Sequence, residues 1–295
     1  MTMYFNVKVS RSILAISVLI FSFIATFIVW GSQSLVHSVL AEDTEEFTRL
    51  PIIMYHGITQ NSKKVNKFVV SEQEFESDLK YIKDNGYTTV VMQDLIDYVY
   101  NDKELPEKPI MLTFDDGYYN NYLYGFPLLK KYECKMVLSP IGKQVDIYSE
   151  CNDRNPAYAH VTWENLKEMV DSGLVEVQNH SYDMHTVGKN RRGTKKNKNE
   201  SMEHYRKAFS EDVEKAQQEM DEHLGLKPTT FTFPFGSVSS CSVDILKEMG
   251  FVATLGCEGR INNLTRDPDK LFGMFRILRP GKADTEKFFK SKIEK

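Results

Sequence analysis

Short apolar runs alternate with amphipathic stretches along most of the chain, and this alternation restricts the possible fold more than any other feature. A repeated β-α order predicts a parallel sheet covered by helices. Seven or eight strands in about 245 residues fit a closed or nearly closed (β/α) barrel, with a doubly wound open sheet as the alternative. Strands are predicted at 52–55, 88–92, 110–114, 135–139, 175–179, 229–233, 251–254 and 275–278. Helices are predicted at 72–85, 93–100, 119–132, 163–172, 203–224, 242–249 and 284–293.

The first 41 residues have a different character. No Asp, Glu, Lys or Arg occurs from Ser12 to Ala41, and the 18 residues from Ile13 to Trp30 would span roughly 27 Å as a helix. That length approaches the roughly 30 Å hydrocarbon core of a bilayer. Lys8 and Arg11 precede the run, so the rest of the chain is expected outside the cytoplasm. We expect residues 1–41 to form a membrane anchor or a signal segment cleaved after Ala41, followed by a polar tether (42–50) and one large domain (51–295).

Composition excludes several classes of partner. The net charge is −4, and the chain has neither a Walker A loop nor a dinucleotide glycine fingerprint, so neither nucleic acid nor a nucleotide is expected to bind. One segment, 189–201, is basic and nearly free of apolar residues, which predicts a solvated, mobile loop or a rim that contacts an anionic polymer. The four cysteines lack the CxxC spacing of zinc sites and allow three disulfide pairings, none of which is favoured: Cys134, Cys151, Cys241 and Cys257.

The strand predicted at 110–114 runs into two adjacent carboxylates, Asp115 and Asp116, followed by Gly117. Neighbouring side chains of a strand point to opposite faces, but a turn at the glycine allows both carboxylates to serve one site. Active sites of parallel β/α folds form at the carboxyl ends of the strands. The alternative is an ordinary surface turn, for which Asp-Asp-Gly is also favourable.

A second polar cluster follows the strand predicted at 175–179. His180 ends this strand and His185 comes five residues later, a spacing that suits a loop better than one face of a helix. Imidazole is the commonest metal ligand in proteins, and two histidines with one carboxylate form a known metal-binding set. Asp116 could complete that set and leave Asp115 as a base for water. Two surface or capping histidines are the alternative.

Together these motifs resemble the polysaccharide deacetylase family, also called carbohydrate esterase family 4 or the NodB homology domain. The resemblance includes TFDDG at 113–117, the histidines of HSYDMH at 180–185, TTFTFPFG at 229–236 and MYHGI at 54–58, and covers roughly residues 50–280. It implies a distorted (β/α) barrel with a divalent metal, most commonly zinc, at its mouth. It also implies specific roles: Asp115 as general base, Asp116, His180 and His185 as metal ligands, and the hydroxyl of Ser181 as a support for the histidine loop.

The chain departs from the family pattern at two places. An arginine that braces the base in many members is replaced by Thr232, so Arg276 or Arg279 is a candidate substitute beside Asp115. The backbone N–H of Phe235 remains a candidate for the oxyanion pocket. The late histidine that usually acts as the acid is also missing. In the branch of poly-N-acetylglucosamine deacetylases, a histidine after the first strand acts as the acid, which implies His56 here.

The remaining candidates receive structural interpretations. His160 and His204 are expected in loops or on the surface, His223 near a helix end, and Trp163 in the core or a groove wall. The predicted function is removal of N-acetyl groups from an extracellular amino-sugar polymer such as poly-N-acetylglucosamine, peptidoglycan or a chitin-like chain. Two alternatives stay open: an anchored glycan-binding protein with impaired catalysis, and an esterase that removes O-acetyl groups.

Overall fold

Seven parallel strands form a ring in the domain that begins at Phe47. The computed structural model describes residues 3, 22, 47–188 and 191–294. Two parallel bridges, Asn179 with Phe231 and Leu255 with Met274, close the ring. They connect the pair formed by β9 (Thr230–Thr232) and β10 (Ala253–Leu255) to the main sheet. The main sheet has the order β12 (Ile277–Leu278), β2 (Ile52–Tyr55), β6 (Pro109–Asp116), β7 (Met136–Pro140) and β8 (Val175–Val177).

The predicted β/α barrel is therefore confirmed, and the open sheet is wrong. The barrel is distorted because two of its joints are single bridges rather than ladders of paired residues. β5 (Thr88–Val90), within the strand predicted at 88–92, lies off the ring and pairs with Pro109–Met111 at the start of β6. The end of β6, from Thr113 to Asp116, pairs with β7 on that side. β5 thus supports the lower end of the barrel, away from the carboxyl ends of the strands.

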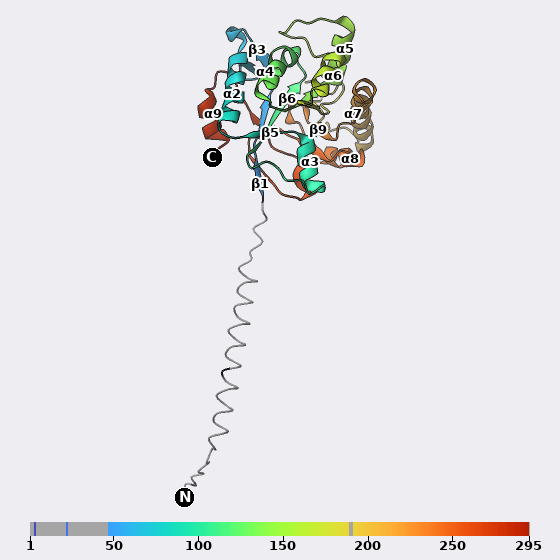
Figure 1. Ribbon diagram of the computed structural model, residues 1–295. Coiled ribbons are helices and arrows are strands. Elements are labelled where there is room, and N and C mark those ends of the chain that lie inside the picture. Colours follow the sequence, from blue (N-terminus) through green and yellow to red (C-terminus); the bar gives the residue numbers. More distant parts are fainter. Residues whose placement is uncertain (1–2, 4–21, 23–46, 189–190, 295) are drawn as a thin grey trace. The chain divides into compact units, whose positions relative to one another are not determined.

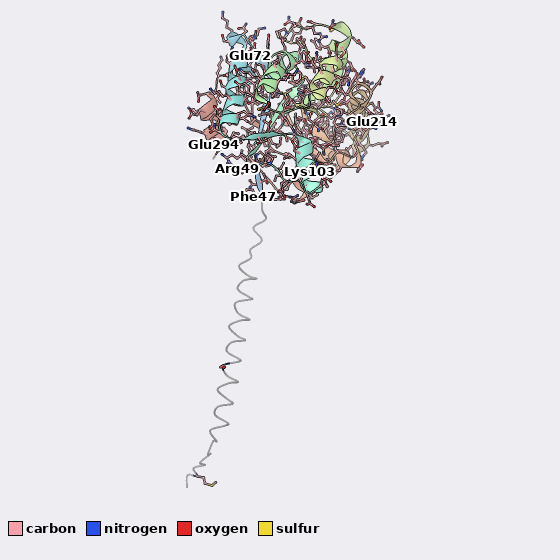
Figure 2. The ribbon with its side chains drawn as sticks, viewed as in Figure 1. Phe47, Arg49, Glu72, Lys103, Glu214 and Glu294 are labelled. Atoms are coloured by element: carbon pink, nitrogen blue, oxygen red, sulfur yellow. The ribbon has the colours of Figure 1, made fainter. Side chains whose placement is uncertain are left out.

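Helices lie around the strands, as Figure 1 shows. The apolar residues of each amphipathic stretch face the barrel; α2, for example, buries Phe75, Leu79 and Ile82. Charged side chains such as Lys103, Glu214 and Glu294 are exposed at the edge of the domain (Figure 2). Seven helices correspond to predicted ones: α2 (Glu72–Asp84), α3 (Met92–Tyr100), α4 (Phe126–Tyr132), α6 (Trp163–Asp171), α7 (Met202–Leu224), α8 (Ser240–Glu248) and α9 (Thr285–Lys292).

Several short elements were not predicted. β1 (Thr48–Leu50) pairs antiparallel with β11 (Asn262–Leu264), so the last residues of the segment predicted as a tether form part of the folded domain. β3 (Gly57–Thr59) begins directly after His56 and forms a separate parallel pair with β4 (Val69–Ser71). The remaining additions are helical: α5 (Gly142–Cys151), the π turn η2 (Asn121–Gly125) and the 3-10 turns η1 (Ser62–Lys64), η3 (Pro234–Gly236) and η4 (Pro268–Leu271).

Two further expectations concern the membrane span and the cysteines. No helix among the described residues is long and apolar enough to cross a membrane. The predicted span, 12–41, lies outside the described residues apart from position 22. The four cysteines, all described, are free thiols, and none of the three conceivable pairings is formed.

Candidate metal and catalytic centre

The turn at the end of β6 brings two carboxylates to the mouth of the barrel. Asp116 has φ 69° and Gly117 has φ 72°, so two consecutive residues adopt the left-handed conformation. Position 117 also needs glycine for space, because a Cβ there would lie 2.6 Å from the Cβ of Pro140. This turn ends the strand immediately after Asp115 and Asp116, both of which are buried. Backbone strain of this kind concentrates at functional sites.

Asp116, His180 and His185 converge as the sequence predicted. Their potential ligand atoms all lie within 4.8 Å of one another. Oδ1 of Asp116 is 3.5 Å from Nε2 of His180 and 3.1 Å from Nε2 of His185. The same oxygen is buried and has no hydrogen-bond partner among the described residues. A buried carboxylate oxygen that faces two imidazole nitrogens fits a divalent cation with nitrogen and oxygen ligands.

The ring of His180 is oriented for this role. Its Nδ1 lies 2.7 Å from the carbonyl oxygen of Thr232, which can only accept a hydrogen bond. Nδ1 therefore carries the proton, and the lone pair of Nε2 faces Asp116. Such an outer hydrogen bond is the usual way in which proteins fix the tautomer of a metal-binding histidine.

The histidine loop is supported by backbone contacts rather than by the Ser181 hydroxyl. Ser181 has φ 71°, and its Oγ is buried without a hydrogen-bond partner among the described residues. Its N–H donates to Oδ1 of Asn179 at 2.9 Å, and its carbonyl accepts from Gly142 at 3.1 Å. Asp212 of α7 accepts hydrogen bonds from the next two backbone N–H groups, those of Tyr182 and Asp183, at 2.9 and 2.8 Å. Asp212 could not be predicted from the sequence, since nothing in a long helix marks one acidic residue as a loop anchor.

Asp115 is paired with Arg276, one of the two arginines proposed from the sequence. The guanidinium donates to both carboxylate oxygens at 2.6 and 2.8 Å, and its Nε donates to the carbonyl of Gly256 at 2.6 Å. Burial raises the pKa of Asp115, but the positive charge of Arg276 and its hydrogen bonds to the carboxylate outweigh burial and hold this pKa below its usual value. Arg276 is only 1% exposed and lies against the base, so it is not an open substrate contact.

The other arginine has a different partner. Arg279 forms a two-pronged pair with Asp78 at 2.8 and 3.0 Å, and both residues are fully buried. The alternative that Arg279 braces Asp115 is therefore wrong. Thr232, at the place of the family arginine, has its hydroxyl 2.8 Å from Oγ of Ser139.

His56 lies beside Asp115 at the mouth of the barrel. It directly follows β2, and the register of β2 and β6 pairs Tyr55 with Phe114. Burial lowers the pKa of His56, although the charges of Asp115 and Asp116 act in the opposite direction. The ring packs edge-on against Phe68 at 5.2 Å, and its Nδ1 is buried without a partner among the described residues.

Phe235 is next to the metal-binding set. Its φ of 56° places it in the left-handed region within the turn η3, and its ring centroid is 4.3 Å from that of His185. The guanidinium of Arg192 lies 5.4 Å from the same ring. The turn thus places the ring of Phe235 against His185, and the role of its backbone N–H as an oxyanion donor stays a prediction.

Two residues of the basic 189–201 segment pack against this turn, whereas Arg192, Lys195 and Lys198 are exposed, so the prediction of a solvated loop holds for only part of it. Gly193 and Thr194 are buried, and Oγ1 of Thr194 donates to the carbonyl of Ser237 at 3.3 Å. The hydroxyl of Tyr205 donates to the carbonyl of Thr194 at 2.8 Å. Hydrogen bonds replace the missing apolar contacts. Residues 189 and 190 lie outside the described part of the chain.

The other histidines vary in their roles. His160, predicted as a loop or surface residue, is buried, and its Nδ1 is 2.9 Å from the carbonyl oxygen of Asp116. His160 therefore supports the turn at the end of β6 that carries Asp116. No local feature of the sequence indicates this role. Trp163 is buried in the core, one of its two predicted positions: its Nε1–H donates to Asp146 at 2.9 Å, and its ring stacks on His223 at 4.7 Å. His204 is exposed and contacts Glu200.

Comparison with known proteins identifies the family. A family model described as "Polysaccharide deacetylase" matches residues 102–254, which is just over half of the chain. The chain belongs to the polysaccharide deacetylase family. The family and the enzyme class predicted from the motifs are confirmed.

Curated members of the family include "Putative polysaccharide deacetylase YxkH" of Bacillus subtilis, 36% identical over 140 residues that cover 48% of this chain and 45% of the relative. The "Poly-beta-1,6-N-acetyl-D-glucosamine N-deacetylase" of Escherichia coli K12 is 25% identical over 250 residues, 78% of this chain and 37% of the relative. The Staphylococcus aureus MRSA252 protein of the same name is 26% identical over 190 residues, covering 64% and 61%. The matches thus span less than two thirds of each relative's length.

Solved deacetylases share the barrel. The structure of a de-N-acetylase from Aggregatibacter actinomycetemcomitans matches with a TM-score of 0.68 and 26% identity, over 81% of this chain and 96% of the other. IcaB from Ammonifex degensii matches with a TM-score of 0.65 and 29% identity, over 78% and 91%.

Proposed function

We propose that this chain is a metal-dependent hydrolase that removes N-acetyl groups from an exported amino-sugar polymer of the poly-N-acetylglucosamine type. The observation that carries the proposal is the ionised, arginine-paired Asp115 immediately beside the Asp116, His180 and His185 set. A protein that only binds glycans needs neither a poised base nor a ligand set. The names of the Escherichia coli and Staphylococcus aureus relatives support this polymer as the substrate.

The residues present fit a zinc ion or a similar divalent cation. Asp116, His180 and His185 would hold it, since their ligand atoms face one another and Oδ1 of Asp116 has no other partner among the described residues. When bound, such an ion supplies Lewis acidity and lowers the pKa of water toward neutrality.

The remaining chemistry belongs to side chains and backbone of this chain. Asp115, kept ionised by Arg276, accepts a proton from the attacking water as its oxygen adds to the acetyl carbonyl carbon. The N–H of Phe235 stabilises the negative charge on the former carbonyl oxygen. His56 donates a proton to the sugar nitrogen as the C–N bond breaks, leaving acetate and a free amine. Burial lowers the pKa of His56, and the neighbouring Asp115 and Asp116 carboxylates oppose this shift and favour the protonated ring that the step requires.

We also propose that the domain works outside the cytoplasm, tethered by residues 12–41 or released by cleavage after Ala41. Support comes from the charge-free stretch and the basic residues before it. Protease added to intact cells should digest residues 50–295, and full protection of the domain would contradict this location.

Acetate release from a panel of polymers tests the activity. The full chain should release acetate from poly-N-acetylglucosamine, with peptidoglycan, chitin oligomers and O-acetylated xylan as the other substrates. Asp115→Asn should remove nearly all activity, and His56→Ala should lower kcat by about 10²–10⁴-fold without changing ion content. Release from xylan alone would favour the O-acetyl esterase, and ion binding without any release would favour the glycan-binding protein.

A further inference from the structure

The ring of His56 lacks the kind of hydrogen bond that orients other buried histidines at this site. In His180 and His160, Nδ1 lies 2.7 and 2.9 Å from a backbone carbonyl oxygen, which fixes the plane of each ring. In His56 the corresponding Nδ1 is buried and has no partner among the described residues. The direction of this ring must therefore depend on its packing against Phe68 and on the position of its own backbone.

Two adjacent asparagines fix that backbone. Nδ2 of Asn121 donates to the carbonyl oxygen of His56 at 2.7 Å. Oδ1 of Asn120 accepts from the N–H of Ile58 at 2.8 Å, and its Nδ2 donates to the carbonyl of Pro156 at 3.0 Å. A further contact of 3.2 Å, from Nδ2 of Asn121 to Oδ1 of Asn120, connects the two amides. The residues on both sides of Gly57 are thus held by side chains distant in sequence.

The asparagines are rigidly placed with respect to the carboxylates. Asn121 is fully buried and begins the π turn η2, only four residues after Gly117. This turn approaches the 57–59 strand closely, because a Cβ on Gly125 would lie 2.9 Å from Cδ1 of Ile58. The segment that carries Asp115 and Asp116 therefore continues directly into the segment that holds His56. Irregular π turns are common at functional sites.

We infer that Asn121 is a positioning residue for His56, with Asn120 as its support. The inference rests on the proposed function, in which His56 is the proton donor. By holding the carbonyl of His56, Asn121 sets the distance and direction of the imidazole relative to Asp115. Its side-chain hydrogen bonds go to His56 and Asn120 and, among the described residues, to none of the proposed metal ligands, so its loss should affect the chemical step rather than ion binding.

Two replacements of Asn121 test this role. Asn121→Asp keeps the shape of the side chain but replaces the Nδ2 donor with a carboxylate oxygen. Asn121→Leu removes the same donor without adding a charge. Each should lower kcat on poly-N-acetylglucosamine by about 10–100-fold, the usual effect of a catalytic group displaced by an ångström or less. KM should change less than about twofold, and ion content should stay that of the wild type. Asn85→Asp is the matched control, since Nδ2 of Asn85 donates to a carbonyl oxygen, that of Tyr81, at 2.9 Å on the exposed end of α2.

A double-mutant cycle separates positioning from a general structural effect. In a His56→Ala background, Asn121→Leu should cause no further fall in kcat, because the group that it positions is already gone. Losses that multiply in the double variant would overturn the inference. An unchanged kcat in either folded single variant would do the same.

A readout without substrate keeps the inference testable if the proposed activity fails. The imidazole NMR signals of His56 in the full chain should shift or broaden in Asn121→Leu and remain as in the wild type in Asn85→Asp. If the wild type releases no acetate from any polymer, the proposed function is wrong, while the NMR comparison still decides whether Asn121 positions His56. Identical His56 signals in the wild type and Asn121→Leu would refute positioning, whatever the reaction.

Discussion

A buried carboxylate is stabilised by a cation that is held in place, and Arg276 supplies this cation for Asp115. The sequence placed Arg276 and Arg279 on equal terms because both belong to the same short segment. They flank β12, and residues three apart in an extended chain point to opposite faces. One side of β12 faces Asp115 and the other faces Asp78. Only the three-dimensional course of this strand distinguishes the two arginines.

Arg276→Lys should lower kcat/KM by about 10²-fold. Lysine keeps the charge but cannot donate two parallel hydrogen bonds, so Asp115 loses its fixed orientation. Initial rates of acetate release measure the effect, and ion content should be unaltered. Arg260→Lys, at an exposed arginine paired with Glu258, is the control and should retain full activity. A fully active Arg276→Lys would show that charge alone suffices.

Residues that support the site by contacting its backbone could not be predicted from the sequence. His160 contacts the carbonyl of Asp116, and Asp212 binds two N–H groups of the histidine loop. The motifs located Asp115, Asp116, His180 and His185 because the end of a strand marks each pair. A residue that supports a loop from elsewhere in the fold has no such mark, since its partner is defined by tertiary structure.

At the scale of elements, the hairpin that follows His185 shows how hydrogen bonds can order a polar segment. Val187 and Arg192 form an antiparallel bridge, and the N–H of Gly193 donates to the carbonyl of Thr186 at 2.9 Å. Arg191 forms an ion pair with Glu200 at the base of the hairpin. The composition of the 189–201 segment predicted a mobile loop, because composition reports how few apolar side chains the segment has. It contains no information about hydrogen bonds between backbone groups.

Gly193→Ala should disturb this hairpin and, through it, the turn at Phe235. Gly193 has φ 55°, and a Cβ would lie 2.8 Å from the carbonyl oxygen of Pro234. We expect a loss of about 1–3 kcal/mol in the free energy of unfolding, the usual cost of a strained backbone position, together with reduced kcat.

Chemical denaturation and acetate release measure the two effects of Gly193→Ala. Gly188→Ala is the control: among the described residues, the atom nearest to a Cβ added there is the carbonyl oxygen of Arg191, 3.8 Å away, and Gly188 is not one of the glycines with positive φ. Equal behaviour of the two variants would mean that the hairpin does not pack on the Phe235 turn in solution.

The long amphipathic helices and apolar strands were predictable, whereas the short elements were not. α2 and α7 have repeated apolar positions that identify their buried faces. α5 buries only Gly142 and Val145, so its sequence contains almost no periodic signal. β3 and β4 have three residues each and pair with one another. Their pairing depends on the course of the segment between them, and strands this short have no recognisable alternation of apolar and polar residues.

For the whole molecule, the pair of Asp78 and Arg279 joins parts of the domain that are 201 residues apart in sequence. Asp78 belongs to α2, and Arg279 follows β12 and donates its backbone N–H to the carbonyl of Met54 in β2 at 3.0 Å. The hydroxyls of Tyr55 and Thr285 also donate to Asp78, at 2.9 and 2.7 Å. This network fastens the last strand and α9 to the first strand of the barrel.

Arg279→Met should reduce the free energy of unfolding by about 3–5 kcal/mol, since it leaves a buried carboxylate without its cation. Urea unfolding followed by circular dichroism measures the change. Arg206→Met, which breaks an exposed pair with Glu248, should cost less than about 1 kcal/mol. Similar losses in the two variants would show that the buried network is not a principal connection of the domain.

Ion binding should stabilise the whole domain, because Asp116 and the loop that carries His180 and His185 come from separate segments that converge only in the folded state. A ligand that binds the folded chain alone adds about 2.7 kcal/mol when its concentration is 100 times Kd. Adding Zn²⁺ to chelator-treated protein should therefore raise Tm, and a chelator should reverse the rise. His180→Ala/His185→Ala should abolish the shift, whereas His204→Ala, at an exposed histidine, should preserve it.

Because Asp115 is no ligand in this assignment, Asp115→Asn should also keep the shift in Tm while losing activity. A Tm that rises equally in the wild type and the double histidine variant would mean that the ion stabilises the chain from another site, and the ligand set would have to be reassigned.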